Sequence, residues 1–521
     1  MPAARTEPDG TVTAETGIVA TSHPLAAEAG AAVLRDGGSA ADAAVAAAAV
    51  LAVVDPPSTG VGGDAFALWW GAGDGAPAAL AGTGPAPAGL TVDALRAAGH
   101  ATMPDCGPWS VTVPGSVSLW ERLLEAHGRL EPTRVLAPAI DLAEQGFALT
   151  PVVAAGWAAS AGRLAPGPRA RLAPGGRTPA AGERVANPAL GAILRGVAER
   201  GAAAFYEGPV GAAIEAVVRD AGGPLRAGDL AAFPGARWVE PISLRFRDVD
   251  VYELPPPSQG IVALQALGVY ERLGATAPAD ADHALAEALK LAFADGAAHV
   301  ADPDHALVPT HALLAGGYLD RRAALVDPAR AARAVAGRPG DTVYVAVADA
   351  EAGACSLIQS LYEGFGSGLE APGTGVLLQN RGSNFVLDPA HPNHPAPGKR
   401  PCHTIIPAML GRASRLAGAL GVVGGFMQPQ GQVQVLRGLL DRGLGPQAAL
   451  DAPRFRIRDG LRIDVEPGFD PASTAELRRR GHEVGRLDPL DAGGAQLVVA
   501  RPEGGFAGAS DHRRDGRAVA R

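Results

Sequence analysis

The sequence lacks the short motifs that mark the most common hydrolases and nucleotide-binding enzymes. It has no G-x-S-x-G, no H-E-x-x-H and no G-x-x-x-x-G-K-[ST]. It therefore carries no signature of a serine nucleophile elbow, a helix-borne zinc site or a phosphate-binding loop. The glycine-rich stretch 58–64 has no lysine after it and leads into an apolar segment, which predicts a tight turn before a strand.

Cysteines, basic clusters and long apolar runs are also scarce. The three cysteines, Cys106, Cys355 and Cys402, form no C-x-x-C pair, which favours reduced thiols over a disulfide framework or a zinc site. The net charge is −9 without any run of five basic residues, so nucleic acid and anionic membranes are not expected as partners. The apolar run 43–54 is too short to span a bilayer, and the polar N-terminus lacks the apolar region of a signal peptide. We expect a cytoplasmic enzyme.

What is present divides the chain into two parts. Residues 40–54 are a predicted helix, and Ser39 and Asp42 have the spacing of a capping box at its start. The pattern from about 130 to 330 is mostly helical. The stretch 327–340 is rich in alanine, arginine, glycine and proline and predicts an exposed, flexible connector.

After this connector the pattern changes to strands. Residues 342–348 and 354–361 alternate between apolar and polar positions and are rich in β-branched residues, which predicts a hairpin of half-buried strands. A short strand at 375–379 follows, and helices return at 432–440 and 471–480.

Asp341-Thr342 stands where the connector meets the first of these strands. By itself, a threonine at the start of a strand indicates only β-propensity. The chain as a whole, however, resembles the γ-glutamyltransferase family of N-terminal-nucleophile hydrolases at ten places in the same order. These are Gly-Gly-Ser-Ala-Ala-Asp-Ala-Ala at 37–44, Val-Pro-Gly-Ser-Val at 113–117, Phe-Tyr-Glu-Gly at 205–208, Pro-Pro-Pro-Ser-Gln-Gly at 255–260, the helix with Glu287, Lys290 and Asp295, Gly-Asp-Thr at 340–342, Gly-Phe-Gly-Ser-Gly at 364–368, Lys-Arg-Pro at 399–401, Gly-Gly at 424–425 and Asp-Ala-Pro-Arg-Phe at 451–455.

The resemblance implies that the chain cuts itself between Asp341 and Thr342, which makes Thr342 an N-terminal nucleophile. A threonine hydroxyl is a weak nucleophile and needs a base. A free α-amino group, with a reference pKa of about 8, can accept its proton. No separate catalytic histidine is then required, in keeping with the scatter of the twelve histidines. The same hydroxyl is expected to attack the carbonyl of Asp341 during maturation.

Three further residues complete the predicted catalytic set. Gly424 and Gly425 match the family's di-glycine, whose N–H groups are implied to stabilise the oxyanion. On the residues alone, a left-handed turn after a strand explains this pair equally well. Ser360 stands where the family has a second hydroxyl that supports the nucleophile's amine, and we expect it to hydrogen-bond Thr342 across the hairpin.

The expected substrate pocket departs from the family pattern. Residues 75–92 contain no charge, so the arginine that holds the α-carboxylate of γ-glutamyl substrates is missing. Asn384 replaces the acidic residue that would bind the α-ammonium, and an amide does not pair with ammonium as a carboxylate does. His403 and Thr404 replace a serine pair, and Tyr362 replaces an asparagine. Both halves of a zwitterion-binding site are therefore absent.

Four side chains remain as candidate contacts for an anion: Arg381, Lys399, Arg400 and His403. For Lys399 and Arg400 a solvated loop is an equally good interpretation. The chemistry favours a substrate with one carboxylate and no α-amine, such as a glutaryl-type or oxamate-like amide. The open alternatives are an amidohydrolase or acyltransferase of the γ-glutamyltransferase family, a small-amide or glutaryl-type acylase without glutamyl transfer, and an unprocessed binding protein.

The resemblance also implies an architecture. We expect an α+β fold, the four-layer αββα sandwich of the N-terminal-nucleophile hydrolases, assembled from residues 1–341 and 342–521 as a heterodimer. The expected partner is a small-molecule amide, with no cofactor. A metal is not expected, because His391, His394 and His403 share a loop region without helical i, i+4 spacing.

Overall fold

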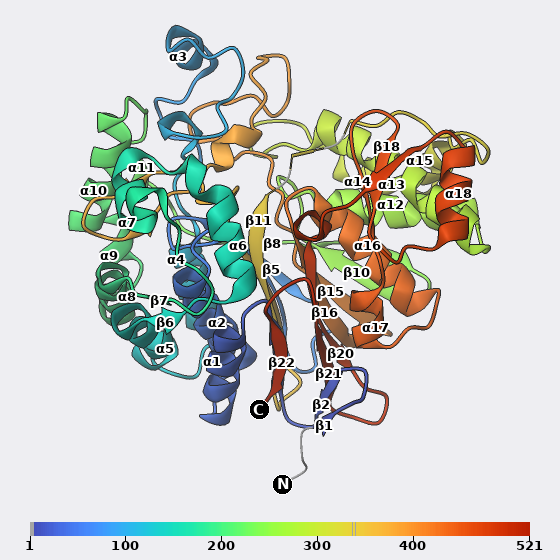
Figure 1. Ribbon diagram of the computed structural model, residues 1–521, viewed down its shortest axis with the longest axis horizontal. Coiled ribbons are helices and arrows are strands. Elements are labelled where there is room, and N and C mark those ends of the chain that lie inside the picture. The colour runs from blue at the N-terminus through green and yellow to red at the C-terminus, as the bar shows by residue number, and fades with distance from the viewer. Residues whose placement is uncertain (1–4, 336, 339) are drawn as a thin grey trace.

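The computed structural model describes residues 5–335, 337–338 and 340–521. Two antiparallel sheets pack face to face, and helices cover the outer face of each (Figure 1). The order of the seven-stranded sheet is β22 (Arg517–Ala520), β3 (Ile18–Thr21), β11 (Asp341–Ala348), β12 (Ala354–Tyr362), β4 (Asp64–Trp70), β5 (Ala78–Gly82) and β8 (Arg237–Val239). The order of the eight-stranded sheet is β1 (Arg5–Thr6), β2 (Val12–Ala14), β21 (Phe506–Ser510), β20 (Gly494–Ala500), β16 (Arg415–Val423), β15 (Ala408–Arg412), β10 (Val249–Glu253) and β9 (Ile242–Phe246).

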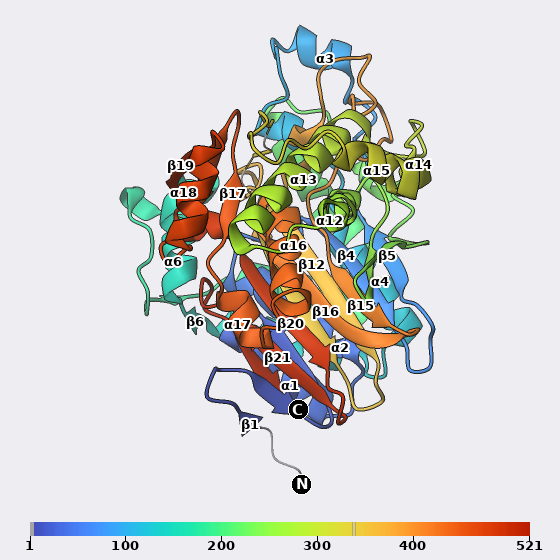
Figure 2. The same cartoon turned by 90° about the vertical axis from the view of Figure 1, so that its right-hand side faces the viewer.

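The two helical layers lie on opposite sides of the molecule (Figure 2). The layer on the seven-stranded sheet includes α1 (Pro24–Arg35), α2 (Ala40–Val54), α4 (Ser116–His127), α5 (Pro132–Gln145), α6 (Pro151–Ser160), α8 (Pro188–Arg200) and α10 (Gly208–Asp220). The layer on the eight-stranded sheet includes α12 (Gly260–Leu273), α13 (Pro278–His299), α16 (Met427–Leu440), α17 (Pro446–Asp451) and α18 (Pro471–Arg479). The predicted αββα sandwich is confirmed.

Shorter elements connect these layers. The remaining helices are α3 (Val92–Ala97), α7 (Pro166–Leu172), α9 (Ala203–Tyr206), α11 (Ala227–Ala231), α14 (Thr310–Leu314) and α15 (Gly316–Ala323). The remaining strands are β6 (Phe147–Ala148), β7 (Arg184–Val185), β13 (Glu370–Ala371), β14 (Val376–Leu377), β17 (Phe455–Ile457), β18 (Arg462–Val465) and β19 (Glu483–Arg486).

The central hairpin of β11 and β12 is more buried than its sequence predicted. Almost every residue of both strands is buried, because α2 packs on one face of the hairpin and the eight-stranded sheet on the other. The expectation of half-buried strands is therefore wrong. A strand covered on both faces keeps small or apolar residues at nearly every position, as Val343, Ala346 and Leu357 illustrate.

The second predicted helix has the expected start. Ser39 accepts a hydrogen bond from the N–H of Asp42, whose carboxylate accepts one from the N–H of Ser39, and this is the predicted capping box. All of α2 is buried, since its alanines allow close approach to the hairpin. The helix ends at Asp55, and residues 56–63 turn the chain into β4 beside β12.

The connector at 327–340 is not free of the fold, contrary to the expectation from its composition. Ala331 and Ala334 are buried. The N–H of Ala331 donates to the carbonyl of Arg480 at 2.7 Å, and Ala334 exchanges two backbone hydrogen bonds with Gly460. The low apolar periodicity of this sequence gave no sign of these backbone contacts, because such contacts do not depend on side-chain pattern.

Candidate active site

The predicted nucleophile lies at the start of β11, in the uncut chain. Thr342 is 4% exposed. Its hydroxyl donates to the carbonyl oxygen of Asp341 at 2.6 Å and accepts from the amide nitrogen of Gln428 at 3.2 Å. The hydroxyl is thus held beside the carbonyl that precedes it.

A β-bulge brings Ser360 to the same carbonyl. Asp341 pairs with Tyr362 and Val343 with Gln359, so two residues of β12 face Thr342 alone. The Ser360 hydroxyl lies 3.4 Å from that of Thr342, as predicted across the hairpin, and donates to the Asp341 carbonyl at 2.6 Å. It also accepts from the N–H of Tyr362 at 2.7 Å. Two hydroxyl donors therefore polarise one carbonyl.

Gly424 and Gly425 lie between β16 and α16, close to Thr342. Their φ angles are 116° and 62°, which favour glycine. Gly424 lines the same cavity as Thr342. The first turn of α16 follows at once and carries Gln428 to the Thr342 hydroxyl. N–H groups at the start of a helix carry partial positive charge, so this corner suits a developing oxyanion.

The cavity at Thr342 has a volume of about 450 Å³ and a lining of both charge signs. Its ionisable residues besides Asp341 are Asp55, Asp105, Glu363, Asp491, Asp515, Arg163, Arg338, Arg456 and Arg514. Burial raises the pKa of Asp55 to about 7, although a hydrogen bond from Ser58 opposes the shift. Burial also raises the pKa of Asp341, while Arg514 and Arg163 act against this rise.

Arg381 and Tyr362 form a buried pair behind the cavity wall, where Tyr362 adjoins the lining residues Gly340 and Glu363. The guanidinium carbon of Arg381 lies 4.3 Å from the centre of the Tyr362 ring. One Arg381 nitrogen donates to the Thr404 hydroxyl at 2.8 Å. The Nε and Nη2 atoms of Arg381, and the Tyr362 hydroxyl, have no hydrogen-bond partner among the described residues. Burial lowers the pKa of Arg381 to about 10, so the group stays cationic at neutral pH.

The backbone of the connector passes over this pair. Arg338 donates to the carbonyl of Ser383 at 2.6 Å. A Cβ atom on Gly340 would lie 3.1 Å from the Tyr362 ring, and one on Gly337 would lie 2.0 Å from the ring of Phe426. Glycines thus let the connector lie flat against both aromatic rings.

Asn384 and His403 are placed differently from each other. The Asn384 amide donates to the carbonyl of Cys402 at 3.0 Å and lines a separate, largely apolar cavity of about 270 Å³ beside Phe426. His403 is fully buried, and its Nε2 lies 3.0 Å from a carboxylate oxygen of Asp64. Burial holds the pKa of His403 well below its usual value. Its role as an anion contact therefore finds no support.

Lys399 and Arg400 are buried, so the interpretation of a solvated loop is wrong, and both side chains bind groups of the protein itself. The Lys399 ammonium donates to the carbonyl of Pro392. Arg400 is 8% exposed and forms ion pairs with Asp302 and Asp304. Groups of the protein already bind both cations, and the positions of these two residues in the sequence did not reveal this.

Comparison with known proteins agrees with this geometry. A family model described as γ-glutamyltranspeptidase matches residues 26–521. The oxamate amidohydrolase proenzyme of Klebsiella pneumoniae is 38% identical, over 96% of this chain and 98% of its own length. The glutathione hydrolase-like YwrD proenzyme of Bacillus subtilis is 37% identical over the same shares. The crystal structure of cephalosporin acylase from Bacillus halodurans is 41% identical, with a TM-score of 0.93 over 100% of this chain and 98% of that one.

The chain belongs to the γ-glutamyltranspeptidase family. It is therefore an enzyme, an amidohydrolase of the N-terminal-nucleophile class. The expectation of a non-catalytic binding protein is set aside by these relatives, which are hydrolase and acylase proenzymes.

Some residues at the site of this family member were missed by sequence reasoning. Gln428, Asp55 and Arg456 approach or line the cavity at Thr342. Gln428 follows the di-glycine by three residues, which was the one available signal. Asp55 was interpreted only as the residue that ends a helix, and no pattern in the sequence distinguished Arg456 from the other arginines.

The histidines of the loop region, His391, His394 and His403, each contact a different protein group. His391 contacts the carbonyl of Ala297, and His394 contacts the carbonyl of His391. Within the described residues, the group with metal-like spacing is instead His283, Glu287 and His482.

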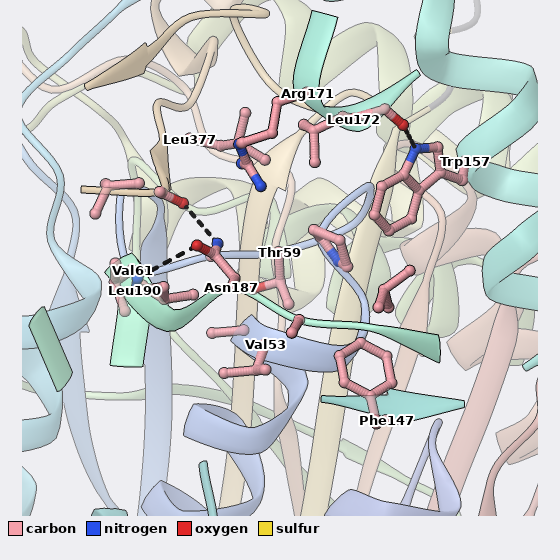
Figure 3. A pocket seen from close by; sticks show the side chains of 17 residues that line it. Val53, Thr59, Val61, Phe147, Trp157, Arg171, Leu172, Asn187, Leu190 and Leu377 are labelled. Atoms are coloured by element: carbon pink, nitrogen blue, oxygen red, sulfur yellow. Dashed lines mark hydrogen bonds between the residues drawn. The ribbon is translucent and has the colours of Figure 1, made fainter. Parts of the chain in front are cut away.

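A narrow second cavity, drawn in Figure 3, shares no lining residue with the cavity at Thr342. It is about 40 Å³ in volume, and Val53, Phe147 and Leu190 are among its apolar walls. Trp157 of α6 points into it and donates to the carbonyl of Leu172 at 2.9 Å. This cavity holds at most a few waters and is not part of the candidate active site. In the described part of the chain, no helix combines the length and apolarity needed to cross a membrane.

Proposed function

We propose that this amidohydrolase matures by cutting its own Asp341–Thr342 bond and then hydrolyses amides through a Thr342 acyl-enzyme. The observation that carries the proposal is the pair of hydroxyl donors, Thr342 and Ser360, on the carbonyl oxygen of Asp341.

Self-cleavage begins when the Thr342 oxygen attacks the carbonyl carbon of Asp341. The C–N bond breaks, the nitrogen takes up the proton of the hydroxyl, and an ester joins Asp341 to the Thr342 oxygen. Ser360 supports the oxyanion, since its hydroxyl already donates to that oxygen at 2.6 Å. Water then hydrolyses the ester and leaves Thr342 with a free α-amine.

Turnover repeats the same chemistry on an external amide. The α-amine of Thr342 accepts the proton of its own hydroxyl, whose oxygen attacks the substrate carbonyl. The N–H groups of Gly424 and Gly425 stabilise the oxyanion. The leaving amine takes the proton, and water then releases the acyl group as a carboxylic acid.

The two pieces, residues 1–341 and 342–521, stay together as a heterodimer. In support, β11 and β12 of the second piece pair with β3 and β4 of the first. In the other sheet, β15 of the second piece pairs with β10 of the first.

The substrate is an amide whose acyl group carries one carboxylate and no α-amine, as in a dicarboxylic monoamide. Arg381 supports this class, because a fully buried guanidinium with two unpaired nitrogens favours an anionic partner. Asn384 offers no charge for an α-ammonium. The names of the relatives, an oxamate amidohydrolase and a cephalosporin acylase, fit amides other than γ-glutamyl compounds. True γ-glutamyl transfer is the alternative.

Mass spectrometry of the purified protein under denaturing conditions tests the cleavage. We expect two pieces, about two thirds and one third of the 52.5 kDa chain, with the smaller one beginning at Thr342. The Thr342→Ala variant should remain whole and inactive. A wild-type chain that stays intact after prolonged incubation would refute the proposal.

A matched pair of anilides tests the substrate class. Glutaryl anilide and γ-glutamyl anilide differ only at the α-amine, so the ratio of their kcat/KM values reports recognition of that group. We expect the glutaryl compound to be preferred by at least about tenfold. A preference for the γ-glutamyl compound would favour the alternative.

A further inference from the structure

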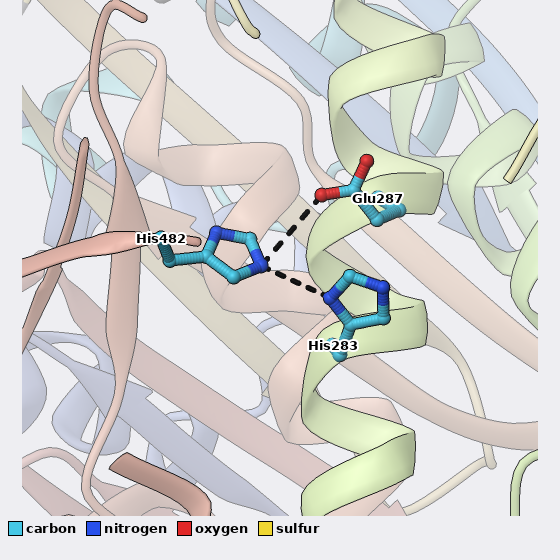
Figure 4. Close-up of side chains that lie close together, drawn as sticks. All are labelled: His283, Glu287 and His482. Atoms are coloured by element: carbon cyan, nitrogen blue, oxygen red, sulfur yellow. Dashed lines mark hydrogen bonds and ion pairs between the residues drawn. The ribbon is translucent and has the colours of Figure 1, made fainter. Parts of the chain in front are cut away.

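A buried polar cluster joins the two parts of the chain far from Thr342 in sequence. His283 and Glu287 lie on successive turns of α13, and His482 approaches them from the turn after α18 (Figure 4). Lys290 follows on the next turn of α13. All four side chains are buried. We refer to these four residues as the anchor cluster.

The hydrogen bonds of the anchor cluster have a single consistent direction. His283 Nε2 lies 3.0 Å from the carbonyl oxygen of Asp327, which can only accept, so His283 donates there. His283 Nδ1 then accepts from His482 Nε2 at 3.0 Å. His482 Nδ1 in turn faces the Lys290 ammonium at 3.5 Å. Both histidines are neutral in this order, in keeping with burial, which lowers the pKa of His482 to about 3 and also lowers that of His283.

The partners of this cluster are backbone groups of the connector. Lys290 donates to Glu287 and to the carbonyl of Ala332, each at 2.7 Å. The second oxygen of Glu287 accepts from the N–H of Ala332 at 3.1 Å. Buried charged side chains therefore bind both backbone groups of Ala332. Hydrogen bonds to charged groups are stronger than those between neutral groups.

Residues of the second part bind the connector from the other side. The carbonyl of Arg480 accepts from the N–H of Ala331, and Gly460 pairs with Ala334 through two hydrogen bonds of 2.8 Å. Beyond Ala334, the Arg338 side chain donates to the carbonyl of Ser383, and the N–H of Phe426 donates to the carbonyl of Arg338 at 3.5 Å.

We propose that the anchor cluster, with Arg480 and Gly460, is a permanent binding site for residues 327–334, which retains the C-terminal segment of the first piece after self-cleavage and releases only residues 335–341. This inference rests on the proposed cleavage before Thr342. Gly337 and Gly340, which lie against Phe426 and Tyr362, belong to the released part, so the cut uncovers the Arg381 pair without detaching the segment. Seven residues reach at most about 25 Å, which keeps the new C-terminus near the active site.

The cluster is satisfied without a metal ion. His283, Glu287 and His482 have ligand atoms within 4.8 Å of one another. However, the hydrogen-bond directions above place a proton on the His482 nitrogen that faces His283. The Lys290 ammonium already binds the Glu287 carboxylate. A cation would have to displace both interactions.

Hydrogen–deuterium exchange read by mass spectrometry tests the inference on the full chain. The cut wild-type protein is compared with the uncut Thr342→Ala variant. Amides of Ala331, Ala332 and Ala334 are expected to exchange at rates within about twofold in both, while amides in 335–341 exchange at least about tenfold faster after the cut. Equal acceleration across 327–341 would overturn the proposal.

Two variants test whether the anchor cluster causes the slow amide exchange of residues 331–334. Lys290→Met should raise exchange at Ala331 and Ala332 by about tenfold or more. Ala332→Pro removes only the N–H bound by Glu287, changes no core residue, and should accelerate exchange at Ala331 and Ala334. The matched control is Arg330→Ala, an exposed position of the same segment, which should leave the rates unchanged. Unchanged exchange in both Lys290→Met and Ala332→Pro would also overturn the proposal.

Two further outcomes are distinguishable. If the wild-type chain never cuts itself, the proposed function fails, and a site-specific protease sequence placed at 337–341 supplies the cut for the same comparison. Dialysed protein is also incubated with Zn²⁺ alone. We expect no stoichiometric zinc, and one tightly bound zinc per chain, lost in His482→Ala, would contradict the bonding order described above.

Discussion

At the scale of single residues, the proposed recognition of a substrate carboxylate depends on donors that have no hydrogen-bond partner among the described residues. Arg381 is fully buried yet leaves Nε and Nη2 without a partner, and the Tyr362 hydroxyl beside it is also unpaired in the described structure. A buried unpaired donor is unfavourable by about 1–3 kcal/mol. Such an arrangement is expected where a ligand supplies the missing acceptor.

Replacement of Arg381 tests this expectation. Arg381→Met keeps most of the side-chain volume but removes the charge and all donors. We expect kcat/KM for glutaryl anilide to fall by about 10–100-fold, because one charged hydrogen bond contributes about 1.5–3 kcal/mol. Hydrolysis of an anilide with an uncharged acyl chain should change far less. Equal losses on both substrates would indicate a structural role for Arg381 instead.

Asp55 predicts a pH dependence of stability. Its folded-state pKa of about 7 lies above the ordinary value of 3.8, so the folded chain holds this proton more tightly than the unfolded chain. The contribution is fully present below about pH 4 and is lost as the pH rises to about 7. Asp55→Asn should therefore flatten the fall in unfolding free energy between about pH 4 and 7, as measured by urea denaturation. A steeper fall in the variant would contradict the assignment.

At the scale of elements, the bulge between β11 and β12 is the feature that assembles the proposed cleavage site. A regular ladder would pair Thr342 with a single residue of β12. The extra residue instead allows Ser360 to reach the Asp341 carbonyl while it accepts the N–H of Tyr362. Tyr362 has a φ of 85°, an unfavourable conformation for a bulky residue that often marks functional sites.

Ser360→Ala should slow self-cleavage by about a hundredfold, since removal of one oxyanion donor typically has an effect of this size. The time course of intact-chain loss on denaturing gels measures the rate. Ser360→Thr keeps the hydroxyl and is the matched control, expected to stay within about tenfold of wild type. Cleavage of Ser360→Ala at the wild-type rate would leave Thr342 as the only contributing hydroxyl.

At the scale of the whole molecule, the two predicted pieces share both sheets and cannot fold as separate layers. Strands of residues 342–521 lie between strands of residues 1–341 in the seven-stranded sheet. The apolar core between the sheets likewise combines Phe66 and Trp70 with Tyr344 and Met409.

The cut protein should consequently behave as one cooperative unit. We expect both pieces to elute together in gel filtration without denaturant and to unfold in a single urea transition, followed by tryptophan fluorescence and by circular dichroism. Non-coincident transitions by the two probes, or release of the smaller piece before unfolding, would show that the pieces are separable.

The sequence by itself determined the family through motifs in the same order, and the resemblance to that family implied the sandwich and the nucleophile candidate. The capping box at Ser39, the strand after Asp341 and the glycine turn at Gly424 are local features of this kind. Their hydrogen bonds join residues close in the chain, so spacing alone was informative.

Only the tertiary structure decided which charged side chains have protein partners for all their donors. Lys399, Arg400 and Arg381 look alike in sequence, yet the first two have protein partners and Arg381 retains unpaired donors. The binding of the connector was equally hidden, since Ala332 meets Lys290 only when α13 packs beside it. Burial and pairing arise from residues distant in the chain, and no local pattern records them.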